Sequence, residues 1–318
     1  MKALYDVPAP AKLNLFLHIT GRRDDGYHLL QSAFMMIDWH DTLHFELRTG
    51  GAISREDLGV PLPAEDLVVR AARALQVAAG TPLGVHISID KRLPAQAGMG
   101  GGSSDAASSL LALNRLWQLK LPLPQLERIG LVLGADVPFF LRGRNAWVEG
   151  IGEQIRPIDL PAARFAVIKP PQGLDTRLIF TDPELKQRTD AAIISGFAAN
   201  SHGAFDESPY AAFERGPYDA FGKNPYDAFE KGPYGFGHND LQSVAQRLCP
   251  GVTQALEWLG SQGLHGRMTG SGSAVFAQLP QGVRLSPAPA GWQLRECSNL
   301  DVHPLLGWAS SDDLSVGG

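Results

Sequence analysis

The chain has 318 residues, 44% of them hydrophobic, and a formal net charge of −5. Because one core rarely serves so long a chain, we expect two domains. The acidic balance and the lack of a basic run argue against nucleic acid or an anionic membrane as a partner. No apolar run approaches the roughly 18 residues of a membrane span and no signal peptide is recognisable, so we expect a cytoplasmic protein. Two cysteines, Cys249 and Cys297, are too few for a disulfide framework or a metal site and are expected to be reduced.

The first fifty residues have the alternating pattern of β-strands. Apolar side chains occupy every second position of residues 11–19, which places Lys12 and Asn14 on the same face of a strand. A charged, glycine-bounded turn at 21–26 follows and leads to Tyr27 and His28, and residues 43–47 alternate again. The opening of the chain is therefore predicted to be rich in β-structure.

A glycine-rich stretch, Pro94–Ala107, lies between a strand pattern at 85–89 and a helical pattern at 106–117. Glycine lets the backbone adopt positive φ and turn several N–H groups toward one point, which favours an anion at the start of the helix. Ser103 or Ser104 is the expected N-cap. A flexible linker is the alternative, but periodic apolar segments flank the stretch closely. The pattern therefore predicts a phosphate-binding loop.

Other phosphate-binding loops are excluded by residues that the stretch lacks. No lysine precedes the serines, as a Walker loop requires, and no third glycine stands at the dinucleotide-fold spacing. No HRD or DFG tripeptide of a protein kinase occurs.

Helices are also predicted at 66–79 and around 126–133, the second ending at Gly134. Pro138 disfavours the helical conformation for Val137, so we expect Asp136 in a constrained loop. A strand at 165–168 follows the boundary expected near 157–161.

Residues 208–235 repeat an eight-residue unit with the core PYxAF, and four of the six tyrosines of the chain lie there. The period matches no solenoid, and a proline in every unit argues against a long helix. We interpret it as a tolerated surface insertion at about 200–236, with an interaction segment as the alternative. Helices are expected over 241–259, then a glycine turn at 270–273 and a strand at 274–279.

Three segments together resemble the GHMP kinases, the family of galactokinase, homoserine kinase and mevalonate kinase. They are Ala9–Asn14 (APAKLN), Gly98–Ala107 (GMGGGSSDAA) and Arg267–Phe276 (RMTGSGSAVF). The resemblance implies an α+β fold of two domains: 1–157, similar to domain 2 of ribosomal protein S5 and binding ATP, and 158–318, ferredoxin-like and carrying the insertion. Within the family, the strings GRRDDGYH, LGADVPFFL and GHNDLQ resemble the members that phosphorylate 4-diphosphocytidyl-2-C-methyl-D-erythritol, a cytidine diphosphate sugar alcohol of non-mevalonate isoprenoid synthesis.

From the residues alone, Lys12 could be a solvated side chain and Asp136 could only brace its turn. The resemblance implies that they are the catalytic pair. Asp136 would accept the proton of the 2-hydroxyl, and Lys12 would keep that carboxylate ionised and stabilise charge during transfer.

The resemblance also implies the binding residues and cofactors. ATP would be bound by Pro94, Ala95, Gln96, Ala97, Gly98, Met99, Gly100, Gly101, Gly102, Ser103 and Ser104. The substrate would be bound by Asn14, Tyr27, His28, Thr176 and Phe180, with the cytosine ring between the two aromatic side chains. Mg²⁺ would be held mainly by phosphate oxygens and water, without a dedicated protein site. We expect a monomer or a weak homodimer.

Two alternatives remain open: a GHMP kinase for another small alcohol, and a non-catalytic nucleotide-binding protein. The chain also departs from the usual family pattern. Asp66 stands where Asn is usual, Met99 where Leu is usual, and no proline follows Thr189. Asp66 would add negative charge near the nucleotide, which would weaken ATP binding.

Overall fold

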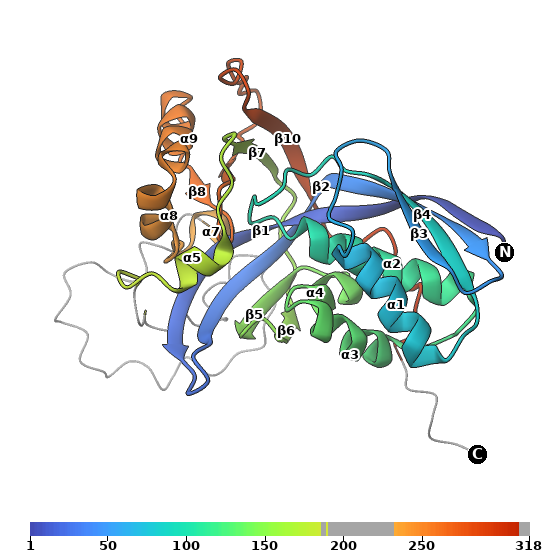
Figure 1. Ribbon diagram of the computed structural model, residues 1–318. Coiled ribbons are helices and arrows are strands. Elements are labelled where there is room, and N and C mark those ends of the chain that lie inside the picture. Colours follow the sequence, from blue (N-terminus) through green and yellow to red (C-terminus); the bar gives the residue numbers. More distant parts are fainter. Residues whose placement is uncertain (186–188, 190–231, 312–318) are drawn as a thin grey trace.

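The computed structural model describes residues 1–185, 189 and 232–311. A long antiparallel hairpin, β1 and β2, dominates the sheet (Figure 1). The described strands are β1 Ala3–Arg22, β2 His28–Arg48, β3 Ile53–Asp57, β4 Gly84–Asp90, β5 Ala146–Gly150, β6 Gln154–Pro157, β7 Arg164–Lys169, β8 Arg267–Met268, β9 Val275–Gln278 and β10 Gln293–Leu300. The described helices are α1 Leu67–Ala79, α2 Gly101–Leu116, α3 Leu123–Leu133, α4 Val137–Arg142, α5 Thr176–Phe180, α7 Gly232–Gly235, α8 Gln242–Leu248 and α9 Pro250–Ser261.

The strands join the two halves of the chain into one sheet. Their order is β3-β4-β2-β10-β7-β9-β8, with β1 and β5 also paired to β2 and β6 paired to β5. Near the C-terminus, β10 is antiparallel to both β2 and β7. The late strand β10 therefore links the sheet of the N-terminal half to that of the C-terminal half.

Apolar side chains form three clusters of buried residues. One packs α1, α2 and α4 on the strands of the N-terminal half. Another lies between the halves around Phe16, Met35 and Phe165. The third packs α8 and α9 on β7 and β9, seen at the upper left of Figure 1. The predicted division at 157–158 falls between β6 and β7, and it stays a prediction.

Most predicted elements are confirmed, from the strand of 11–19 within β1 to the two C-terminal helices. One prediction was wrong at Val137, which begins α4 instead of being excluded from a helix. Pro138 occupies the first turn of α4, where the missing N–H costs no hydrogen bond and the fixed φ suits the helix. Asp136 is therefore held at a helix N-terminus.

The tandem repeats fall mostly outside the described residues, so their interpretation is not tested there. The start of the fourth unit is described, and its aromatic side chains pack inside the molecule. The Tyr234 ring lies edge-on to Phe165 at 5.1 Å, its hydroxyl donates to Pro161 O, and the buried Phe236 ring lies 5.0 Å from Phe16. Phe236 belongs to the core and the partly buried Tyr234 packs against it, because both meet apolar partners that the eight-residue period does not show.

Both cysteines are buried free thiols, as expected. No helix in the described ranges is long and apolar enough to cross a membrane.

His303 generates a prediction about stability and pH. Its ring is 1% exposed, its Nδ1 accepts from Leu305 N–H at 3.0 Å, and its backbone N–H donates to Gly143 O at 2.9 Å. Burial lowers the pKa of His303 from 6.5 to about 4, because the charged ring would lose its hydration. The stabilisation of the folded state by the neutral His303 ring is thus complete above pH 6.5, and it is lost as the pH falls toward 4.

We expect the free energy of unfolding to fall by about 3 kcal/mol between pH 7 and pH 4 from this residue. Urea unfolding of wild type and His303→Asn, which does not titrate, measures this as a difference in slope. His265→Asn, at an exposed histidine, is the control for a histidine-to-asparagine change outside the core. Parallel pH profiles for wild type and His303→Asn would contradict the assignment.

Candidate active site

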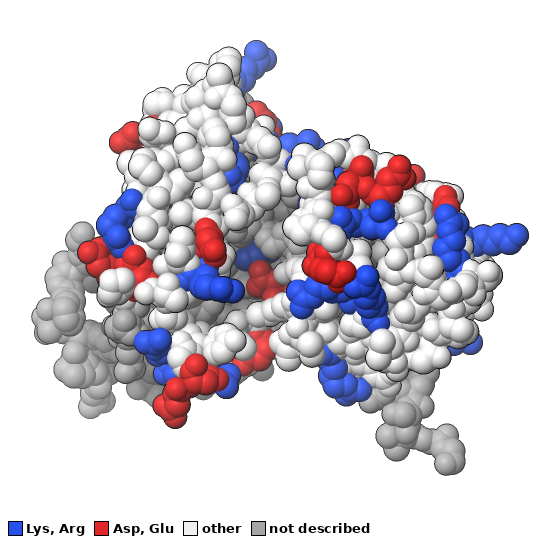
Figure 2. Space-filling model, viewed as in Figure 1, with Lys and Arg blue, Asp and Glu red and all other residues white. Residues whose placement is uncertain are grey.

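A cavity of about 1160 Å³ lies between the two halves of the molecule. Figure 2 shows a hollow near the centre of this face, with acidic and basic side chains mixed around it. The lining comes from β1, the tip of the β1–β2 hairpin, the glycine-rich loop, the residues before α4, α5 and the turn at 270–272. All the predicted site residues line it except Ser104.

The glycine-rich loop is clamped between β1 and the glycine turn of the C-terminal half. Met99 O accepts from Lys12 N–H at 2.9 Å, and Gln96 O accepts from Ser273 N–H at 3.1 Å. Gly98 has φ +70°, and a Cβ there would lie 2.2 Å from Thr269 O. A side chain at this position would therefore separate the loop from the turn.

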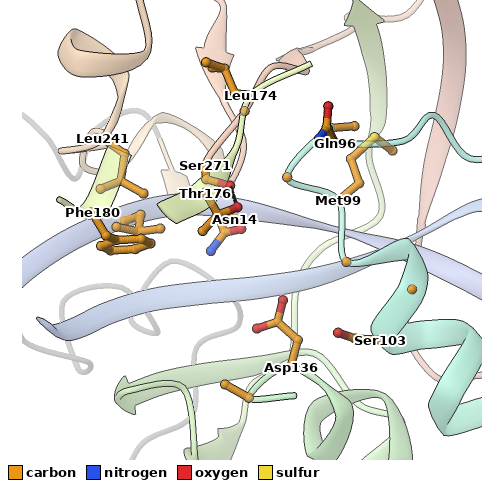
Figure 3. Close-up of a pocket in the computed structure, with 18 of the residues that line it drawn as sticks. Asn14, Gln96, Met99, Ser103, Asp136, Leu174, Thr176, Phe180, Leu241 and Ser271 are labelled. Carbon is orange, nitrogen blue, oxygen red and sulfur yellow. Dashed lines mark hydrogen bonds between the residues drawn. The ribbon is translucent and has the colours of Figure 1, made fainter. Parts of the chain in front are cut away.

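The loop leads into α2 through Gly100, whose φ is +71°. The expectation of a serine cap was wrong. Gly100 is the N-cap residue, so Ser103 and Ser104 already lie inside the first turn of the helix. The Ser103 side chain points toward the cavity in Figure 3, whereas Ser104 is fully buried and its Oγ has no hydrogen-bond partner in the described structure.

Lys12 and Asp136 lie together, although they come from β1 and from the loop before α4. Lys12 Nζ is 3.5 Å from an Asp136 carboxylate oxygen and 2.5 Å from Asn14 Oδ1. It also lies 4.4 Å from the centre of the Phe34 ring, a cation–π contact. The lysine side chain is buried, whereas that of Asp136 is 30% exposed and faces the cavity (Figure 3). A carboxylate open to the cavity and fixed by a buried cation can accept a proton from a bound hydroxyl.

Asn14 has the orientation that the alternating pattern predicted. Its Oδ1 accepts from Lys12, its Nδ2 donates to Ser32 Oγ at 3.0 Å, and its backbone N–H donates to Thr269 Oγ1 at 2.8 Å. These contacts fix the amide beside the Lys12–Asp136 pair.

Aromatic rings gather at the other end of the cavity. The rings of His28 and Phe180 lie 5.5 Å apart between centres at an angle of 35°, and Tyr27 is exposed beside them. Burial, and then the charge of Arg22, lower the pKa of His28. At neutral pH the imidazole is therefore uncharged, with one nitrogen that donates and one that accepts. Such a group can pair with the edge of a heterocyclic base.

Thr176 begins α5 and contacts the glycine turn, with 2.7 Å between its Oγ1 and Ser271 Oγ (Figure 3). A glycine-rich turn such as 270–273 can offer backbone N–H groups to a ligand. Two of these already donate within the protein, Gly272 to Thr269 O and Ser273 to Gln96 O. Only the first half of the turn can therefore serve a ligand with its backbone.

Lys91 supports the glycine-rich loop, a role that the sequence pattern does not indicate. Lys91 Nζ contacts Asp41 and lies 2.6 Å from Asp105 Oδ2. Burial raises the pKa of Asp105, and Lys91 opposes that rise. A lone lysine after the strand of 85–89 gives no signal of this cluster, because Asp41 is distant in sequence.

Asp66 is the N-cap of α1, where it accepts from Val69 N–H, and its Oδ1 lies 2.7 Å from Arg55 Nη1. Arg55 therefore compensates the charge that sequence analysis expected to act on the nucleotide.

Among the residues that the structure describes, no group of three His, Cys, Asp or Glu side chains could hold a metal ion. The glycine cradle does fit a nucleotide phosphate, since its glycines line the cavity at the start of α2, where the first backbone N–H groups of a helix favour an anion.

Comparisons with known proteins agree with this geometry. Residues 66–144 match the model of the GHMP kinase N-terminal domain, and residues 213–281 match that of the GHMP kinase C-terminal domain. The chain is 66% identical to the 4-diphosphocytidyl-2-C-methyl-D-erythritol kinase of Albidiferax ferrireducens, over 100% of this chain and 99% of the relative. It is 66% identical to the protein of that name from Variovorax paradoxus, over 98% and 100%. A crystal structure of 4-(cytidine 5'-diphospho)-2C-methyl-D-erythritol kinase matches with a TM-score of 0.68 and 30% identity, covering 92% of this chain and 98% of that chain.

The contact between Gly98 and the turn generates a prediction. We expect Gly98→Ala to lower the free energy of unfolding by about 3 kcal/mol, the sum of left-handed strain and displaced backbone. Gly80→Ala is the matched control, because Gly80 also has positive φ (+58°) but a Cβ there meets nothing within 4 Å. Strain alone should cost that variant about 1 kcal/mol. Equal losses in urea unfolding would show that the loop–turn contact contributes nothing.

Proposed function

The chain belongs to the GHMP kinase family, and on this premise we propose that it transfers the γ-phosphoryl group of ATP to the 2-hydroxyl of 4-diphosphocytidyl-2-C-methyl-D-erythritol. One observation carries the proposal. The Lys12–Asp136 pair lies in a single cavity that has a glycine cradle on one side and the His28–Phe180 aromatic end on the other. A kinase for a nucleotide-linked alcohol needs this arrangement, because the acceptor hydroxyl must meet the donor between two separate binding sites.

The glycine-rich loop would hold the triphosphate through backbone N–H groups at the start of α2, with Ser103 at its edge. The nucleotide supplies the phosphoryl group. Mg²⁺ would be held by phosphate oxygens and water, since the described protein groups form no cluster of three acidic or histidine ligands.

Asp136 would accept the proton of the 2-hydroxyl as that oxygen attacks. Lys12, fixed by Asn14 and by the Phe34 ring, would hold the carboxylate in place and offset negative charge that develops during transfer. Burial of Lys12 strengthens both effects, since water screens its charge poorly there.

The neutral His28 and the Phe180 ring would select a pyrimidine. An uncharged imidazole can donate to or accept from the edge of cytosine, and an aromatic ring stacks on its face. This feature favours the cytidyl substrate over a small alcohol such as homoserine or mevalonate, which has no base to stack. The test measures ADP release from ATP with the cytidyl substrate, with homoserine and with mevalonate. Release with the cytidyl substrate alone would establish the activity and exclude non-catalytic nucleotide binding.

Asp136→Asn should lower kcat about 10²- to 10⁴-fold, because it removes the base while keeping its shape. ATP affinity, measured by calorimetry, should change little. Asp25→Asn is the control: Asp25 also lines the cavity, but it pairs with Arg23 at 2.8 Å on the hairpin tip. A near wild-type kcat for Asp136→Asn would remove Asp136 from the mechanism.

Phe180→Ala should raise KM for the cytidyl substrate about tenfold and leave KM for ATP unchanged, because loss of stacking and burial acts on the base alone. Leu178→Ala, at an exposed position of the same short helix, controls for damage to α5. An equal rise of both KM values would argue against a dedicated pyrimidine site.

A further inference from the structure

Arg22 stands at the tip of the β1–β2 hairpin, beside the aromatic end of the cavity. It is the last residue of β1, it pairs in register with His28, and its side chain lines the cavity. The turn that follows is closed by Arg23 N–H donating to Tyr27 O at 2.8 Å and by Gly26 N–H donating to Arg23 O at 2.9 Å. Arg22 Nε donates to Gly26 O at 3.0 Å, so the guanidinium is anchored by one edge.

This anchoring leaves the terminal nitrogens of Arg22 for a ligand. Nη1 and Nη2 form a planar fork that matches two oxygens of a phosphate. A fork whose Nε is already bonded loses less freedom when it binds, because part of the side chain is fixed beforehand.

Arg22 differs from the other cationic side chains that line the cavity, because those are paired with carboxylates. Lys12 is paired with Asp136, and Lys91 contacts Asp41 and Asp105. Arg22 forms no ion pair with any carboxylate of the described residues, although Asp25 is close in sequence. Asp25 is paired with Arg23 instead. Arg22 is thus the cavity cation, within the described structure, whose charge is not already balanced.

The substrate that we propose carries negative charge near this point. A cytosine ring between Tyr27 and Phe180, with its edge at His28, would place its ribose and the adjoining phosphate within the same end of the cavity as the hairpin tip. That phosphate would otherwise enter a cavity whose other cations are occupied, at a cost in lost hydration.

We propose that Arg22 binds the phosphate next to the cytidine ribose and so makes the site specific for a cytidine nucleotide over the nucleoside. This inference rests on the proposed function, and it names a specificity residue for that site. The arginine does not contact the base, since the neutral His28 would bond the edge of cytosine and the two aromatic rings would stack on its faces.

The test measures binding of cytidine, CMP and CDP to the full chain by calorimetry at low and at physiological salt. Arg22→Gln removes the charge, and Arg22→Lys keeps it without the fork. Arg23→Gln is the matched control, because Arg23 is the next hairpin residue, pairs with Asp25 and does not line the cavity.

Wild type should bind CMP more tightly than cytidine, and we expect Arg22→Gln to reduce this affinity ratio about tenfold. A tenfold change corresponds to the loss of one charge-assisted hydrogen bond. The affinity of Arg22→Gln for cytidine should equal that of wild type, and its KM for ATP should not change. Arg22→Lys should recover part of the ratio, and added salt should reduce the ratio in wild type more than in Arg22→Gln. Arg23→Gln should behave as wild type.

Three results would overturn the proposal. An equal loss for cytidine and CMP would mean that Arg22 only supports the hairpin or contacts the base. A loss of affinity for CDP alone, with the affinity for CMP unchanged, would mean that Arg22 binds the second phosphate instead. Unchanged affinities in Arg22→Gln would remove it from the site. If wild type bound neither cytidine nor CDP, the proposed function would fail along with this inference, a pattern distinct from the other three.

Discussion

The close contact between the glycine-rich loop and the turn at 270–273 is the constraint on which the site depends. Gly98 and Gly270 approach so nearly that a Cβ on either would meet the backbone of the other segment. Two hydrogen bonds, from Ser273 to Gln96 O and from Ala274 to Ala97 O, fasten the same contact. Because the loop belongs to the N-terminal half and the turn to the C-terminal half, this contact fixes the cavity between them.

The β1–β2 hairpin supplies residues at the middle of the cavity and at its aromatic end. Lys12 and Asn14 lie midway along β1, whereas Tyr27 and His28 lie where the hairpin turns back. A strand advances about 3.3 Å per residue, so these positions keep a fixed separation along one rigid element. The same hairpin therefore sets the distance between the place where a base would stack and the place where a hydroxyl would react.

Buried charges around the cavity are paired, as the low dielectric of the interior requires. Lys12 with Asp136, Lys91 with Asp41 and Asp105, and Arg55 with Asp66 each balance a charge that would otherwise be costly. The pairs are also geometric clamps, because each joins segments that are distant in sequence. Removing one partner would leave the other charge without compensation and loosen the segment that it holds.

The sequence by itself determined the local elements: the alternation that puts Lys12 and Asn14 on one face, the glycine loop between a strand and a helix, and the family to which the motifs point. Only the tertiary structure decided that Lys12 meets Asp136, that His28 faces Phe180, that Ser104 is buried, and that Phe236 is a core residue with Tyr234 packed against the core. Periodicity fixes which face a side chain occupies, because the backbone repeat is local. It does not fix which distant segment packs against that face, since this depends on the burial and pairing of the whole chain.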